Sequence, residues 1–301
     1  MSDKRRHNLV TILGVFLILC GSASAATPAS TQDPAAASGR IALNASWAWV
    51  LDKNAPLAQR RQELSKIERD AQTGDQHDLY VLGSLYHMGQ HAPGSLVRQD
   101  LVKASLYLGN AATRGSVLAM AKMAEIKLVT RQYREAMNWA QIYGHYALLL
   151  PKGDRPHDGY AAELVQRIID KLGKSAMPEV MRDVDSFIAS HDADIRAGTD
   201  SKFTGEVLHP GPKARPYVAP GGRIAPYAGF ADYLLAFNAD GSVADAWLLD
   251  AVPTPDLGLI LRKYAREMRV PPAKARNAKR LRYAWMPVLY DDGRYRVTPV
   301  H

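Results

Sequence analysis

The chain has 301 residues, 47 % of them hydrophobic, and it carries 38 Lys or Arg against 30 Asp or Glu, a formal net charge of +8. Cys20 is the only cysteine, which excludes an intramolecular disulfide and a metal site built from several thiolates. Beyond the N-terminal segment, about 275 residues suffice for two domains of ordinary size.

Residues 1–25 have the layout of a secretory signal peptide. Basic residues at positions 4–6 precede an apolar run at 9–20, and small residues end at Ala25, where we expect cleavage. The apolar run is short of the roughly 20 residues that a membrane-spanning helix needs, although a retained anchor stays an alternative. A lipid-modified Cys20 would need a small residue in place of Leu19. We therefore expect a periplasmic protein, soluble after cleavage, with membrane association left open.

Residues 26–43 are rich in Ala, Ser, Thr and Pro, which is typical of a disordered leader. From residue 44 to 197 the apolar residues recur at helical spacing, for example at Val165, Ile168, Ile169 and Leu172. This region is expected to be an α-helical domain.

Two offsets within the helical region indicate an internal repeat. Gly74 and Gly115 are 41 residues apart, whereas Ala104 and Ala136 are 32 apart. A second helical hairpin that lacks the nine-residue loop 90–98 explains both offsets.

The first hairpin resembles a Sel-one-like repeat, a relative of the tetratricopeptide repeat. This resemblance implies helix pairs stacked into an α–α superhelix, with small residues where helices approach and a concave surface that binds a partner protein. The second copy is more degenerate, because Ala124 stands where the first has Gly83. The residues that carry the resemblance are Ala71, Gly74, Leu82, Gly83, Tyr86, Gly89, Asp100, Lys103, Ala104, Tyr107, Ala111, Ala112 and Gly115.

Residues 198–227 contain five prolines, which block helices and sheet ladders, and they are expected to form a semi-rigid linker. Residues 228–301 then predict a small, independently folding α/β domain in the order strand, strand, helix, strand. We expect residues 222–301 to fold alone.

The elements of this second domain have local signals. Asp240-Gly241 is a turn signal between apolar runs at 232–238 and 243–249, which predicts a β-hairpin. Thr254-Pro255 predicts a helix start, and the helix is expected to run to Met268. A third strand is expected at 280–290, on an edge because it contains Pro287.

This order resembles the C-terminal domain of the TonB energy-transducer family. The matching positions are Phe237, Asp240-Gly241, Val243 and the segment 268–273. The Trp and Phe of the family's usual step are replaced by Met268 and Val270, and Pro226-Tyr227 reverses the usual Tyr-Pro entry. The fold class expected for the whole chain is therefore an α–α superhelix followed by a small TonB-C-like α/β domain.

The sequence contains no recognisable catalytic motif, and we expect no catalytic, cofactor-binding or metal-binding residues. His87 and His91 have the spacing of two metal ligands on a helix, but Gly89 between them predicts a helix end. Asp75 and Asp78 lie at a repeat boundary, where carboxylates more often cap helices than perform acid–base chemistry.

The strongest charge feature is the stretch from 262 to 282, in which Glu267 is the only acidic residue. It is either a solvated surface or a contact for an anion or an acidic partner, and such a contact would weaken with salt. Its basic residues are Arg262, Lys263, Arg266, Arg269, Lys274, Arg276, Lys279, Arg280 and Arg282.

Together these features predict a non-catalytic envelope adaptor. The helical array would bind one or more partner proteins, and the basic stretch could meet anionic lipid or wall polymer; nucleic acid is not expected. The alternatives are an enzyme or enzyme subunit that acts on cell-wall polymer, and a TonB-like transducer if the N-terminal segment is a retained anchor.

Overall fold

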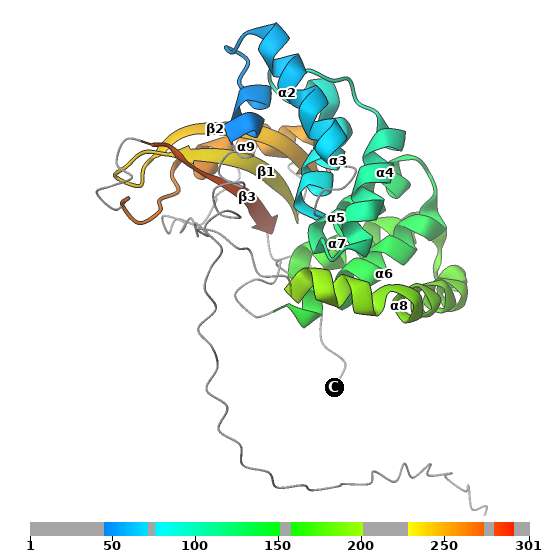
Figure 1. Cartoon of the computed structure of the whole chain (residues 1–301). Helices are drawn as coiled ribbons and strands as arrows, with labels where there is room; N and C mark the ends of the chain where they lie inside the picture. The colour runs from blue at the N-terminus through cyan, green and yellow to red at the C-terminus, as the bar shows by residue number, and fades with distance from the viewer. Residues whose placement is uncertain (1–44, 72–75, 151–157, 201–227, 274–279, 292–301) are drawn as a thin grey trace, which may run out of the picture. The chain divides into compact units, whose positions relative to one another are not determined.

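A computed structural model describes residues 45–71, 76–150, 158–200, 228–273 and 280–291 (Figure 1). The predicted signal peptide, leader and proline-rich linker therefore lie outside the described residues, apart from the first three linker positions. No described helix is both long and apolar enough to cross a membrane.

The N-terminal part is helical, as predicted, and begins with helical residues 45–51. The two short 3-10 turns are η1 (Gly89–His91) and η2 (Lys174–Ala176). The helices are α2 (Leu57–Asp70), α3 (Gln76–Met88), α4 (Leu101–Thr113), α5 (Val117–Val129), α6 (Tyr133–Leu149), α7 (Asp158–Leu172) and α8 (Met177–Asp200).

The helix boundaries follow the offsets seen in the sequence. Helix α5 starts 41 residues after α3, and α6 starts 32 residues after α4. Within each pair, α3 packs on α4 and α5 on α6. A Cβ added to Gly83 of α3 would lie 2.5 Å from Cγ of Leu108 on α4, so the small residue permits the close approach of the first pair.

The C-terminal part is an antiparallel sheet of β1 (Ala228–Phe237), β2 (Val243–Val252) and β3 (Arg282–Asp291), with helix α9 (Pro255–Arg266) between β2 and β3 in the chain. The strand order is β2-β1-β3, so β1 is central and β3 pairs with β1 alone among the described strands. The predicted hairpin, helix and third strand are confirmed, and Pro287 lies on an edge strand as expected.

Helix α9 ends at Arg266, two residues before the predicted end at Met268. Two backbone contacts to the hairpin turn explain the earlier end. Arg269 forms an isolated bridge with Ser242, and the N–H of Val270 donates to the carbonyl of Gly241 at 3.0 Å. The chain must become extended to make them.

Both faces of the sheet are covered (Figure 1). On β1, Tyr233 and Leu235 pack in one hydrophobic cluster with Leu257 and Leu261 of α9. The residues that alternate with them, Phe230 and Leu234, belong to a second cluster that contains the cores of the helices. Helices α3 and α7 contact the sheet directly. This shared core argues against the expectation that residues 222–301 fold by themselves.

Candidate functional site

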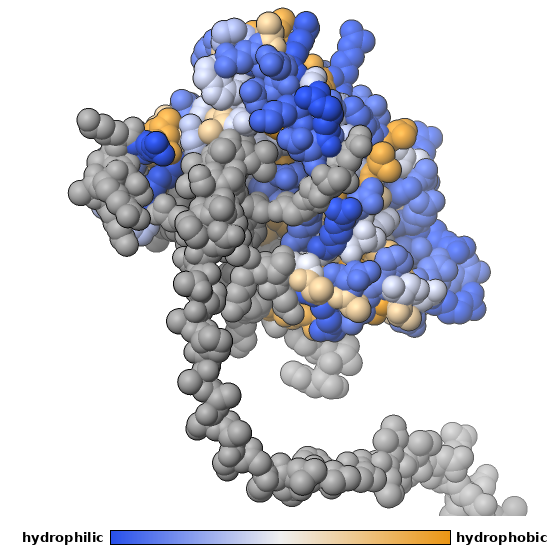
Figure 2. All heavy atoms as spheres, viewed as in Figure 1, coloured by the Kyte–Doolittle hydropathy of each residue, from blue (hydrophilic) through white to orange (hydrophobic). Residues whose placement is uncertain are grey.

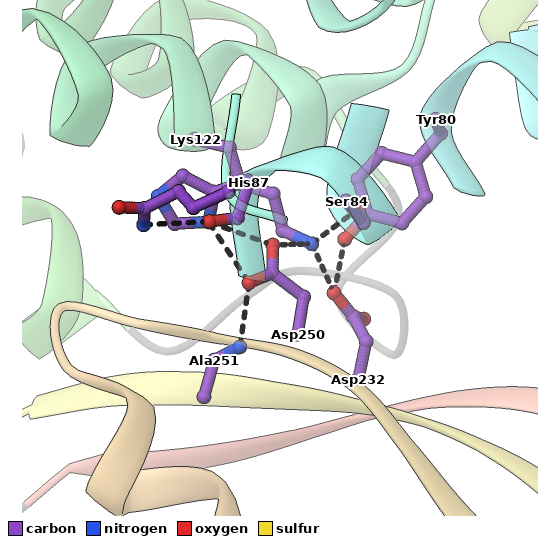
Figure 3. A network of polar contacts seen from close by, with 8 residues as sticks. Tyr80, Ser84, His87, Lys122, Asp232, Asp250 and Ala251 are labelled. Atoms are coloured by element: carbon purple, nitrogen blue, oxygen red, sulfur yellow. Dashed lines mark hydrogen bonds and ion pairs between the residues drawn. The ribbon is translucent and has the colours of Figure 1, made fainter. Parts of the chain in front are cut away.

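A cluster of charged side chains is buried between the helices and the sheet (Figure 3). Lys122 of α5 lies 2.5 Å from Asp232 of β1 and 2.7 Å from Asp250 of β2, measured from Nζ to a carboxylate oxygen. The side chains of Lys122 and Asp250 are 0 % exposed. Ionised groups are seldom taken this far from water unless they are paired, so the cluster is the first candidate for a site.

An irregularity in β2 positions the two carboxylates. Asp232 and Asp250 are direct partners across β1 and β2, but the next pair joins Tyr233 to Leu248. Leu249 is thus an additional residue, and it packs in the helical cluster while Leu248 packs against α9. The bulge lets Leu249 and Asp250, adjacent in sequence, both face the helices. Bulges commonly redirect a side chain in this way.

Three side chains of α3 complete the cluster. The Lys122 ammonium donates to Ser84 Oγ at 2.6 Å, and the Tyr80 hydroxyl donates to Asp232 Oδ2 at 2.6 Å. Nδ1 of His87 lies 2.8 Å from Asp250 Oδ1. The ammonium also lies 4.4 Å from the centre of the Tyr80 ring, a favourable cation–π position.

The electrostatics differ between the two carboxylates. Burial raises the pKa of Asp232 above its ordinary value, although Lys122 and Tyr80 oppose this shift. Burial would also raise the pKa of Asp250, but His87 and Lys122 together lower it. Burial and the neighbouring Asp232 raise the pKa of Tyr80. Like charges directly opposite each other on neighbouring strands repel, so the lysine between them is required for both to be ionised.

The contacts of the cluster favour a structural role over catalysis. Lys122 uses its three N–H donors on Ser84, Asp232 and Asp250. Asp250 also accepts from the backbone N–H of Ala251 at 2.8 Å. Among the ion-paired side chains of this cluster, His87 is the most exposed, at 13 %. Groups with filled hydrogen bonds and little exposure fix the sheet on the helices, while a reacting group needs access to substrate.

A second buried ion pair lies on the same helix. Glu125 of α5 receives two hydrogen bonds from Arg167 of α7, at 2.9 and 2.5 Å, and one from the Tyr160 hydroxyl at 2.8 Å. The Tyr160 ring packs edge-on against Phe230 of β1, with ring centres 5.4 Å apart. Helix α5 therefore carries two charged residues that tie it to neighbouring elements.

The basic stretch predicted from sequence is distributed over several elements. Lys263 and Arg266 are exposed on α9, Arg262 is partly exposed there, and Arg269 and Arg280 are exposed outside it. Arg282 is buried and donates to the carbonyl of Pro271 at 2.6 Å, so the structure removes it from any exposed contact. Lys274, Arg276 and Lys279 lie outside the described residues.

The two histidines of the predicted pair make different contacts. His87 binds Asp250, whereas His91 is exposed in η1. No group of three potential metal ligands occurs among the described residues. Asp78 lies in the first turn of α3, where a carboxylate interacts well with the helix dipole; Asp75 falls outside the described part.

The sequence does contain a signal for the buried cluster, although none of the motifs discussed above includes it. Lys122 and Glu125 interrupt a helix of Ala, Met, Ile and Val, and Asp232 and Asp250 interrupt apolar strand segments. A charged residue at a position that periodicity assigns to the core indicates a buried partner. The pairing itself could not be read, because it depends on which helix covers the sheet.

Comparison with protein-family models, with characterised proteins and with solved structures finds no match for this chain.

Proposed function

We propose that the protein is a non-catalytic adaptor of the bacterial envelope, exported by its N-terminal signal, that binds a partner protein through its helices. The 41-residue offset and the small residues at the helix contacts support a Sel-one-like array. The strand, strand, helix, strand order supports a TonB-like C-terminal domain. In this proposal the C-terminal domain packs against one side of the helical array.

The sheet covers one side of the helices and so restricts where a partner can bind. Helices α3 and α5 contribute Ser84, His87 and Lys122 to the buried cluster, so the side of the array formed by these helices is occupied by the protein's own sheet. Displacing the sheet would expose several buried apolar side chains, each at a cost of about 1.5–3 kcal/mol. A partner is therefore expected on the opposite side, at α4.

One observation on α4 carries the proposal. Val102 is 84 % exposed and Leu106 is 62 % exposed, and they lie one helical turn apart. Figure 2 shows hydrophobic residues at the surface in the α4 region among mainly hydrophilic ones. Contiguous exposed apolar surface is typical of a contact with another protein, and these two side chains are neighbours on the helix. We call Val102 and Leu106 the α4 contact pair.

The test uses a photo-crosslinking amino acid at position 106 of the full-length protein in living cells. A matched probe at Lys66, exposed on α2, is the control. A discrete cross-linked species from position 106, lost when Val102 is changed to Ser, supports the proposal. Equal cross-linking from both positions contradicts it.

An enzyme that acts on wall polymer is the second candidate, because Lys122, His87 and two carboxylates converge, although their filled hydrogen bonds and burial weigh against catalysis. Perturbed ionisable groups gather at active sites as well as in structural clusters. Release of soluble fragments from purified wall polymer, abolished by Asp250→Asn in protein that is still folded, would support this candidate. A TonB-like transducer instead requires an uncleaved N-terminal segment as its membrane anchor. The intact mass of the protein isolated from the envelope shows whether this segment is retained.

A further inference from the structure

Helix α9 has an outer face that the sheet leaves free. Its inner face, with Leu257, Leu261 and Ala265, is buried against the strands. The outer face carries Leu259, Arg262, Lys263 and Arg266, whose spacing of three, four and seven residues places them on one side of a helix. We call these four residues the α9 basic face.

The cations of this face are not neutralised by neighbours. Some exposed arginines elsewhere have acidic partners: Arg134 pairs with Glu179 and Asp183, and Arg196 pairs with Asp192. Within the described part of the chain, Arg262, Lys263 and Arg266 make no ion pair. The helix dipole favours Lys263 and Arg266 in the last turn but does not supply a counter-charge.

An apolar side chain lies among these cations. Leu259 is 51 % exposed, so about half of its surface remains in water. A leucine within a group of unpaired basic residues suits the boundary between lipid headgroups and acyl chains, where cations meet phosphate and the apolar side chain leaves water. A soluble hydrophilic polyanion would match the charges and leave Leu259 in water.

We infer that the α9 basic face binds the surface of an anionic phospholipid bilayer. This contact goes beyond the α4 contact pair and rests on the proposed envelope location, but not on the proposed protein partner. Each Lys or Arg near an anionic bilayer strengthens binding about fivefold. The attraction decreases over a Debye length of about 8 Å at physiological salt.

The experiment is flotation of the mature protein with vesicles of phosphatidylglycerol and phosphatidylcholine, compared with vesicles of phosphatidylcholine alone. We expect binding to the anionic vesicles and a decrease of about 25-fold for the variant Lys263→Gln/Arg266→Gln at low salt. The control Arg61→Gln/Lys66→Gln, which removes the same charge from the exposed side of α2, should bind like the parent. Leu259→Ser should weaken binding in high salt, where the electrostatic part is screened.

Equal binding of the parent and the α9 variant overturns the inference, as does an equal loss in the α2 control. Binding of soluble polyglutamate without binding of vesicles would assign the face to an acidic polymer and also overturns it. Cross-linking at position 106 is scored separately. A failure of the lipid contact can thus be distinguished from a failure of the adaptor proposal.

Discussion

Replacing Lys122 with Met removes the only lysine of the buried cluster. Asp232 and Asp250 would then face each other across β1 and β2 with the same charge. Removal of one partner from a buried ion pair costs about 3–5 kcal/mol, which is a large part of the stability of about 5–15 kcal/mol that is usual for a domain. We expect Lys122→Met to lower the free energy of unfolding by this amount at pH 7.

The pH dependence gives a sharper form of the same prediction. Without Lys122, burial raises the pKa of Asp232 in the folded state further above its unfolded value of about 4, and Asp250 loses one of the two groups that lower its pKa. Groups with a raised folded pKa bind more protons in the folded state, so stability falls as the pH rises through that range. The deficit of Lys122→Met should therefore be smallest near pH 4 and complete at pH 7.

The measurement is urea denaturation followed by circular dichroism at both pH values. Lys66→Met, on the exposed side of α2, is the control and should change stability by less than about 0.5 kcal/mol. Adding Asp232→Asn and Asp250→Asn to Lys122→Met should recover part of the loss, because the repulsion disappears. A Lys122→Met deficit below about 1 kcal/mol, or one that does not change with pH, would refute the burial argument.

Three further predictions concern the helices and the shared core. Gly83→Leu should cost a few kcal/mol and lower the melting temperature, because an added Cβ would already lie 2.5 Å from the side chain of Leu108; an unchanged melting temperature would contradict the observed helix contact. Arg167→Met should cost about 3 kcal/mol, since it leaves a buried carboxylate unpaired, whereas Arg134→Met, from an exposed pair, should cost less than about 1 kcal/mol in the same denaturation assay. The fragment 222–301 should give poorly dispersed NMR spectra, because its helix-facing side would be exposed; a well-dispersed spectrum would restore the independent domain.

The parts of the fold with local signals could be predicted from the sequence. The helix offsets were visible because α3 and α5, and likewise α4 and α6, start at the spacings of the matching residues, and the hairpin was visible because Asp240-Gly241 favours a turn. Thr254-Pro255 fixed the start of α9 within one residue. Its end was predicted less well, because the bridge between Arg269 and Ser242 is a contact between segments distant in sequence.

The candidate site could not be predicted, for the same physical reason. Its members come from α3, α5, β1 and β2, and only the packing of the sheet on the helices brings them together. The bulge at Leu249, which turns Asp250 toward the helices, has no glycine to signal it. Charge within the apolar segments marked Lys122 and Asp232 as unusual, but the partner of each depends on tertiary structure.

If the helices and the sheet form one cooperative unit, a partner must bind outside the covered side. Native-state hydrogen exchange tests this cooperativity directly in the full-length protein. We expect amides of residues 230–235 in β1 and 120–125 in α5 to open with the same free energy, and Lys122→Met to lower both free energies equally. Exchange of the β1 amides at a much lower free energy than those of α5 would show that the sheet detaches by itself and that the two parts are not one cooperative unit.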